Sequence, residues 1–140
     1  MLLVQTDTTV GFVSQNAAAL AACKERPPSK PFLKTFASWG DYTKTGRIPA
    51  RFRREARRAG KTTFIVKNAA FRVVPEGPYH VLLRSYGWLY STSANASGQR
   101  YDARYAFERA SVIVEGGRGL FEDLPSAIYR LNHQVKRRIR

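Results

Sequence analysis

Short apolar runs separated by polar and turn-forming residues recur along the whole chain. Leu2–Gln5 is such a run, and the polar stretch Thr6–Thr9, followed by Gly11, is interpreted as the turn that ends it. Runs of β-branched and aromatic residues suit a pleated, half-buried surface. The pattern therefore predicts strands at Leu2–Gln5, Thr62–Lys67, Phe71–Val74, Trp88–Thr92, Val112–Glu115 and Ala127–Tyr129.

Segments with helical signals lie between these strands. Asn16 can cap a helix that continues to Lys24, and Pro27-Pro28 ends it because proline lacks the amide hydrogen and clashes with the preceding turn. A loop rich in Pro, Ser and Gly follows. Strands interleaved with helices favour an α/β fold with a mixed sheet. The other helices predicted are Arg51–Ala59, which stops at Gly60, Pro78–Ser85 and Ala103–Arg109.

Length and charge narrow the class of protein. The 140 residues fit one domain, taken as 1–140, and 44% apolar residues suffice for a core. Lys and Arg outnumber Asp and Glu by 24 to 10, which gives a net charge of +14 and a pI near 10.6. A polyanion is therefore the first partner to consider. We predict that RNA binds the cations of one basic segment, namely Arg51, Arg53, Arg54, Arg57, Arg58 and Lys61.

Several other kinds of site find no support in the sequence. Gly60-Lys61-Thr62 resembles the end of a phosphate-binding P-loop, but Glu55 stands where that motif needs glycine, and a strand follows instead of a helix. Cys23, His80 and His133 are too dispersed to form a metal site, so no protein metal ligands are predicted. Two isolated histidines also give no indication of a hydrolytic triad.

The chain contains no apolar stretch long enough to span a membrane, so no membrane partner is predicted. The longest uncharged stretch, Thr8–Cys23, contains Thr, Ser, Gln and Asn. The first residues lack the basic and apolar regions of a secretory leader, and a lone Cys23 cannot form an internal disulfide. A reducing cytoplasm is the expected location.

Small polar and basic residues follow two of the predicted strands and one predicted helix. Ligands of open α/β sheets bind outside the strand ends, where Thr6–Thr8 and Ser91–Asn95 would lie. Lys24 and Arg26 could supply a point charge and a planar fork for a phosphate or carboxylate. The alternative is that both cations only complement the helix dipole and that the Ser/Asn loop is an ordinary turn.

The same residues carry a resemblance to a known family. Gln5–Phe12 is similar to the PTDTVYGL segment of the YrdC/Sua5 family, Lys24–Pro31 to its KxRPxxKP, and Ser91–Gly98 to its STSANxSG. Elements between and after these motifs follow the family order up to about Ile128. The further matches are Thr62–Ile65 with LTFI, Phe71–Pro75 with VRVP, Glu115–Gly117 with D-x-G and Leu124–Ile128 with the PSTI element.

The resemblance implies a YrdC-like fold, a twisted open mixed sheet with flanking helices and a concave basic cleft. It also implies a threonylcarbamoyl-AMP synthase, a nucleotidyltransferase that joins L-threonine, bicarbonate and ATP with Mg2+ and releases pyrophosphate for the t6A modification of tRNA. Other proteins of that pathway would be partners. The implied roles are catalysis by Lys24, Arg26, Ser93 and Asn95, ATP binding by Lys24, Arg26, Thr63 and Ser93, and L-threonine binding by Thr6, Arg72, Ser91 and Ser126.

Some positions depart from the family pattern. Gln5 replaces the motif proline and Val10 its aromatic residue, which alters one wall of the implied threonine pocket. Arg58–Lys61 replaces a Trp-Pro-Gly-Pro segment, and Ala127 replaces the threonine of PSTI. Two alternatives therefore stay open. One is a non-catalytic member that binds nucleotide or double-stranded RNA, and the other is a basic structural protein.

Overall fold

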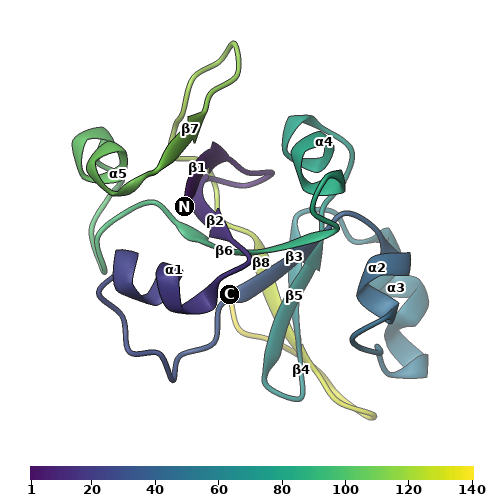
Figure 1. Cartoon of the computed structure of the whole chain (residues 1–140). Helices are drawn as coiled ribbons and strands as arrows, with labels where there is room; N and C mark the ends of the chain where they lie inside the picture. The colour runs from purple at the N-terminus through teal and green to yellow at the C-terminus, as the bar shows by residue number, and fades with distance from the viewer.

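The computed structural model describes residues 1–140, which form a nine-stranded sheet with helices around it (Figure 1). The strands are β1 (Leu2–Gln5), β2 (Val10–Ser14), β3 (Leu33–Phe36), β4 (Thr62–Val66), β5 (Ala69–Val73), β6 (Trp88–Ser93), β7 (Val112–Val114), β8 (Ala127–Leu131) and β9 (Lys136–Arg138). The helices are α1 (Ala17–Cys23), α2 (Trp39–Thr43), α3 (Arg53–Arg58), α4 (Pro78–Arg84) and α5 (Ala103–Arg109), and the 3-10 helix η1 (Ala50–Phe52) precedes α3.

The sheet is mixed, as the sequence predicted for an α/β fold. Its strand order is β7-β1-β2-β6-β3-β5-β4-β8-β9. The pairs β1–β7, β3–β5 and β4–β8 are parallel, and the other neighbours are antiparallel. Strands that are distant in sequence thus become neighbours, which brings the polar motifs to one region.

Helices cover most of one face of the sheet. Alternate residues of a strand point to opposite faces, and the register places Phe12, Phe36, Phe64 and Phe71 on the same face. Helices α1 and α5 pack against Phe12 through Leu20, Ala21 and Ala106. Helices α2 and α3 cover the three other phenylalanines through Tyr42 and Ala56.

The second face is covered only in part. It carries Val13 and Leu89, against which α4 packs with Tyr79 and Leu83. The Tyr79 hydroxyl and the Thr35 hydroxyl are 2.8 Å apart, and Thr35 donates to the main-chain oxygen of Leu89 at 2.9 Å. Beyond α4 this face carries the polar side chains of the predicted site, and no helix covers them.

Strands β2, β3 and β9 and helix α2 were not predicted from the sequence. The polar stretch Thr6–Thr9 lies between β1 and β2 as predicted, but Gly11, which was assigned to the same turn, lies in β2, which begins at Val10. Gly11 is required within that strand, since a Cβ there would lie 2.8 Å from the main-chain oxygen of Thr92. Helix α2 begins after Ser38, whose side chain accepts from the Asp41 amide at 3.0 Å and so caps the helix. The helix was not predicted because this segment was interpreted as a loop rich in Pro, Ser and Gly.

Element boundaries also differ from the prediction. The turn between β4 and β5 is Lys67-Asn68, both with positive φ as in a tight hairpin, so β5 starts at Ala69 instead of Phe71. The basic helix divides into η1 and α3 and ends at Arg58. Strand β9 contains only cationic residues and depends on its pairing with β8. No helix is long and apolar enough to cross a bilayer.

Candidate functional site

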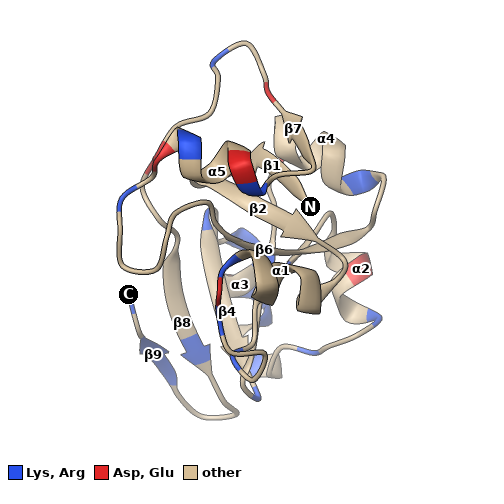
Figure 2. Ribbon diagram, turned by 60° about the vertical axis from the view of Figure 1, so that its left-hand side comes forward, with Lys and Arg blue, Asp and Glu red and all other residues tan.

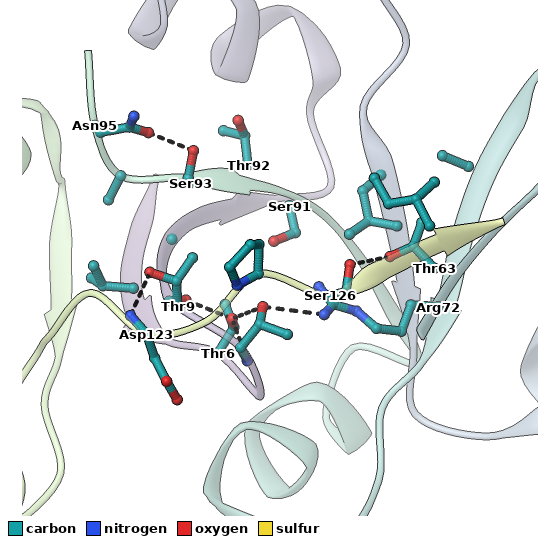
Figure 3. A pocket seen from close by; sticks show the side chains of 18 of the residues that line it. Thr6, Thr9, Thr63, Arg72, Ser91, Thr92, Ser93, Asn95, Asp123 and Ser126 are labelled. Carbon is teal, nitrogen blue, oxygen red and sulfur yellow. Dashed lines mark hydrogen bonds between the residues drawn. The ribbon is translucent and has the colours of Figure 1, made fainter. Parts of the chain in front are cut away.

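A cavity of about 410 Å³ lies on the part of the second sheet face that α4 leaves open (Figure 3). The register explains its lining, because Gly11 pairs with Ser93, and Thr35 with both Leu89 and Arg72, so their strands present one continuous face. Eight of the nine residues predicted for catalysis, ATP or threonine line this cavity. They are Thr6, Arg26, Thr63, Arg72, Ser91, Ser93, Asn95 and Ser126.

Lys24 is the predicted residue that does not line the cavity. Its ammonium group donates to the main-chain oxygen of Ser93 at 2.8 Å and to the main-chain oxygen of Asn95. The residue is buried, and burial lowers the pKa of the ammonium group. Lys24 thus fixes the end of β6 from behind. Its predicted role in catalysis and ATP binding stays a prediction.

The end of β6 carries a network of polar groups along one wall of the cavity. The Ser93 hydroxyl donates to the Asn95 side-chain oxygen, as Figure 3 shows, and the Asn95 amide donates to the main-chain oxygen of Gln99. Ser93 lies in β6 and not in the loop after it. Only Asn95 of this pair belongs to the loop that the sequence predicted.

Arg26 reaches the cavity from the segment after α1. Its Nη2 donates to the main-chain oxygen of Pro31 at 3.0 Å, and the guanidinium lies over the Phe32 ring at 4.7 Å. The Nε atom is buried and has no hydrogen-bond partner. The planar group is therefore held in one orientation while a donor stays unused.

The turn after β1 is built from threonine hydroxyls. Thr6 Oγ1 donates to the main-chain oxygen of Thr9 at 2.6 Å and accepts from the Thr8 amide at 3.2 Å. Thr6 is buried, so its hydroxyl fixes the turn in addition to lining the cavity. The predicted contact of Thr6 with L-threonine stays a prediction, and its hydroxyl already has partners within the turn.

Arg72 is the buried cation of the site, with a side chain only 4% exposed. Its Nη1 lies 3.4 Å from Asp7 Oδ2 and donates to Thr8 Oγ1 at 3.1 Å. Burial raises the pKa of the Asp7 carboxyl, and the Arg72 charge opposes this rise. The pair aims the guanidinium at the cavity from β5, and its Nε has no partner.

A hydroxyl pair forms the opposite wall. Thr63 and Ser126 are 63 residues apart, yet the parallel pairing of β4 with β8 brings their Oγ atoms to 2.9 Å (Figure 3). Both residues are buried. These hydroxyls can exchange hydrogen bonds with a polar ligand as well as with each other.

Sequence reasoning missed four polar residues that also line the cavity, Thr9, Glu122, Asp123 and Arg140. Thr9 Oγ1 accepts from the Asp123 amide at 3.3 Å, and Arg140 Nε donates to the main-chain oxygen of Ser126 at 3.2 Å. Thr9 lies within the Gln5–Phe12 motif, whereas no motif signals the other three residues. They reach the site because the segment before β8 crosses the open face and β9 returns beside β8. The two acids make the cleft less basic than predicted.

The predicted RNA-binding cations lie elsewhere. All six are exposed, none lines the cavity, and α3 packs against the helix-covered face of the sheet. Arg51 Nη1 donates to the main-chain oxygen of Gln134 at 3.2 Å, which places the β8–β9 hairpin beside α3. A neighbouring groove is lined by five cations and no acid, namely Arg47, Arg53, Lys67, Arg130 and Arg137. Figure 2 shows Lys and Arg positions, in blue, on strands β8 and β9.

A comparison with curated sequences gives a distant relative. No family model matches the sequence. An uncharacterized MG259 homolog of Mycoplasma pneumoniae is 30% identical over 101 residues, which are 70% of this chain and 21% of that protein. The chain thus spans about a fifth of this curated relative.

Solved structures cover nearly the whole chain. P. abyssi Sua5 in complex with L-threonine superposes with a TM-score of 0.81 and 19% identity, over 99% of this chain and 49% of Sua5. HypF in its phosphate- and nucleotide-bound form gives a TM-score of 0.71 and 19% identity, over 99% of this chain and 26% of HypF. The twisted mixed sheet with flanking helices, which the motifs predicted, is confirmed, and the chain has the YrdC/Sua5 fold.

Proposed function

We propose that the chain belongs to the YrdC/Sua5 family and is a threonylcarbamoyl-AMP synthase of the t6A pathway. The observation that carries the proposal is that polar residues from motifs far apart in sequence line one cavity on the open sheet face. Arg26, Arg72 and Ser93 come from three different motifs of the resemblance. A purely structural basic protein does not require that convergence.

The deep end of the cavity suits an amino acid. Arg72 is buried and offers an unpaired Nε, so a carboxylate can take the fork-like contact that guanidinium groups favour. Ser91, Thr63 and Ser126 surround it with hydroxyl groups that can donate to or accept from a polar side chain. L-threonine in the Sua5 structure supports this choice of ligand.

The outer part of the cavity suits phosphates. Arg26 and Arg140 line it, and planar guanidinium groups bind phosphate with two parallel hydrogen bonds. Glu122 and Asp123 line the same cavity and could hold Mg2+, which usually binds one or two carboxylates together with substrate phosphates. When bound, that ion would neutralise phosphate charge.

In the proposed reaction the carbamate formed from L-threonine and bicarbonate attacks the α-phosphorus of ATP. The new bond joins a carbamate oxygen to phosphorus, and the bond to the leaving pyrophosphate breaks. Positioning and charge neutralisation supply most of the rate in such transfers. Arg72 would orient the threonine part, and Arg26 would stabilise charge on the phosphates.

Two of the departures from the family pattern, Gln5 and Val10, lie at one edge of the site. Gln5 Oε1 accepts from the Phe121 amide at 3.0 Å, and the Val10 amide donates to the Phe121 main-chain oxygen at 3.1 Å. The two altered positions therefore hold the segment that crosses the open face. Val10 also lines the cavity, but its side chain is buried with Phe12 and Leu20 in the core on the other face of the sheet.

The decisive experiment measures pyrophosphate release from ATP with and without L-threonine and bicarbonate. Release that requires both co-substrates supports the synthase. An Arg72→Lys variant keeps the charge but loses the fork, so its KM for threonine should rise, whereas Arg84→Lys on the exposed end of α4 should match wild type. Threonine-independent release, or no release at all, would remove the synthase proposal.

The second candidate is a module that binds nucleotide or RNA without turnover. The exposed cations of α3 and the acid-free groove beside them favour it, because phosphate backbones are held by such surfaces. ATP binding without pyrophosphate release would favour this candidate over the synthase.

A further inference from the structure

The two edge strands of the sheet differ in character. Strand β9 at one edge consists of the cations Lys136–Arg138, and charge on an edge strand opposes pairing with a further strand. Strand β7 at the other edge consists of the apolar residues Val112–Val114. Sheets usually protect an edge with charge, proline or a covering segment, so an uncharged apolar edge is an exception that favours pairing with another strand.

Strand β7 is open to solvent along its outer side. The side chains of Val112, Ile113 and Val114 are 51%, 42% and 36% exposed, and β7 pairs only with β1 (Figure 1). The Val112 amide donates to the main-chain oxygen of Met1 at 3.1 Å, and successive residues of a strand direct their main-chain groups to opposite sides. The amide and carbonyl groups of Ile113 therefore point away from β1, where no other strand lies.

The charges near β7 balance, in contrast to the net charge of +14 on the whole chain. Residues 102–118 contain three cations and three acids, namely Arg104, Arg109, Arg118, Asp102, Glu108 and Glu115. Arg104 lies 3.0 Å from Glu108, and Arg109 lies 3.0 Å from Glu25. Two copies of this basic protein can therefore meet at the β7 edge with little of the repulsion that like charges impose elsewhere on the surface.

We infer that β7 pairs with β7 of a second copy of this chain, antiparallel and around a two-fold axis at Ile113. In this arrangement the amide of each Ile113 donates to the carbonyl oxygen of the other. Each Val112 faces Val114 of the second copy, which forms apolar pairs across the two strands. Glu115 faces Ser111 of the second copy, whose hydroxyl can donate to the carboxylate.

The pattern of β7 is self-complementary, as a two-fold interface requires, so the association closes at two copies. The same pairing is disfavoured at the other edge, because β9 would place its cations opposite identical cations. The residues of β7 lie outside the candidate site, so the dimer does not depend on the proposed synthase activity.

The test is sedimentation velocity of the full chain over a range of protein concentrations, at low and at high salt. The mass should rise with concentration from 15.8 kDa towards twice that value, and salt should strengthen the dimer because it screens the net repulsion between two basic copies. A monomer under all these conditions would overturn the inference. Association that salt weakens would also overturn it, because acids of one copy would then be contacting the basic surface of another.

A matched pair of variants tests the edge itself. Ile113→Lys places two like charges opposite each other at the two-fold axis, so the dimer Kd should rise at least about tenfold. Val81→Lys, at an exposed position of α4, adds the same charge to each copy and should dimerise like wild type. Unchanged dimerisation of Ile113→Lys would exclude β7 as the interface.

Hydrogen exchange of the wild-type protein decides the question if Ile113→Lys does not fold. The Ile113 amide should exchange freely in the monomer and more slowly at concentrations where the dimer forms, because it then donates across the two-fold axis. An Ile113 amide that exchanges equally fast in monomer and dimer would place the interface elsewhere.

Discussion

Lys24 Nζ and the main-chain oxygen of Ser93 lie 2.8 Å apart, which ties the end of α1 to the end of β6. The same ammonium group bonds to the main-chain oxygen of Asn95, and the side chain is buried. The charged group of Lys24 therefore holds the main chain at the end of β6 in place. Its neighbours, Ser93 and Asn95, present their side chains to the cavity because their main-chain oxygens are held from behind.

Replacing Lys24 with methionine should lower the free energy of unfolding by about 1 to 3 kcal/mol. The variant keeps the apolar stem but leaves two partly buried main-chain oxygens without their charged donor, and hydrogen bonds to charged groups are the stronger ones. Urea denaturation measures the change. Lys30→Met, at an exposed position, is the matched control and should match wild type. Equal stability of both variants would contradict a structural role for Lys24.

Arg26→Lys should weaken ATP binding by about 1 to 3 kcal/mol although the charge is kept. Lysine cannot reproduce the planar fork, and it loses the stacking on Phe32 at 4.7 Å. Isothermal titration with ATP gives the affinity, and Arg84→Lys serves as the control for a distant arginine. If Arg26→Lys binds ATP like wild type and turns over normally, Arg26 does not contact the phosphates.

Threonine should be preferred over serine and valine despite the altered pocket wall. The hydroxyls of Thr63, Ser126 and Ser91 can pair with a substrate hydroxyl, and valine would leave them unpaired. We expect valine to be used at least about a hundredfold less well than threonine and serine to lie between them. Pyrophosphate release with each amino acid provides the rates. Equal rates with the three amino acids would contradict this preference for threonine.

The motifs made most of the site predictable, because Arg72 lies within a recognisable strand and Ser126 lies directly before one. The site residues and contacts that could not be predicted depend on tertiary packing. Strand β9 contains only cations and exists through its pairing with β8, so Arg140 could not be assigned to the site. The partners of Lys24 were equally hidden, since they are main-chain oxygens at the end of a strand 69 residues away.

Tyr79 should make the protein less stable in alkali. Burial raises its pKa to about 12 from the usual 10.0, so the unfolded chain loses this proton first. Stability should therefore fall as the pH rises from about 10 to about 12, by about 2 to 3 kcal/mol for this group. Urea unfolding at pH 8 and pH 11 measures the loss.

Tyr79→Phe removes the ionisation and should flatten this part of the alkaline loss. It also removes the bond with Thr35, so its stability at pH 8 should drop by about 1 kcal/mol. Tyr86→Phe, at an exposed tyrosine, controls for the general effect of alkali. An alkaline loss in Tyr79→Phe as steep as in wild type would show that Tyr79 is not its source.

RNA should bind the cations of α3 mainly through phosphates. Arg54 and Arg58 are exposed on this helix, and exposed cations can hold a phosphate backbone without reading the bases. Affinity for tRNA and for an unrelated double-stranded RNA should be similar and should fall steeply between low and high salt.

Replacing both arginines with glutamine should weaken binding to both RNAs equally and reduce the salt slope by about one for each phosphate that the protein no longer neutralises. Arg84→Gln on the opposite face of the sheet should bind like wild type, and affinity that ignores salt would rule out this surface as the RNA site.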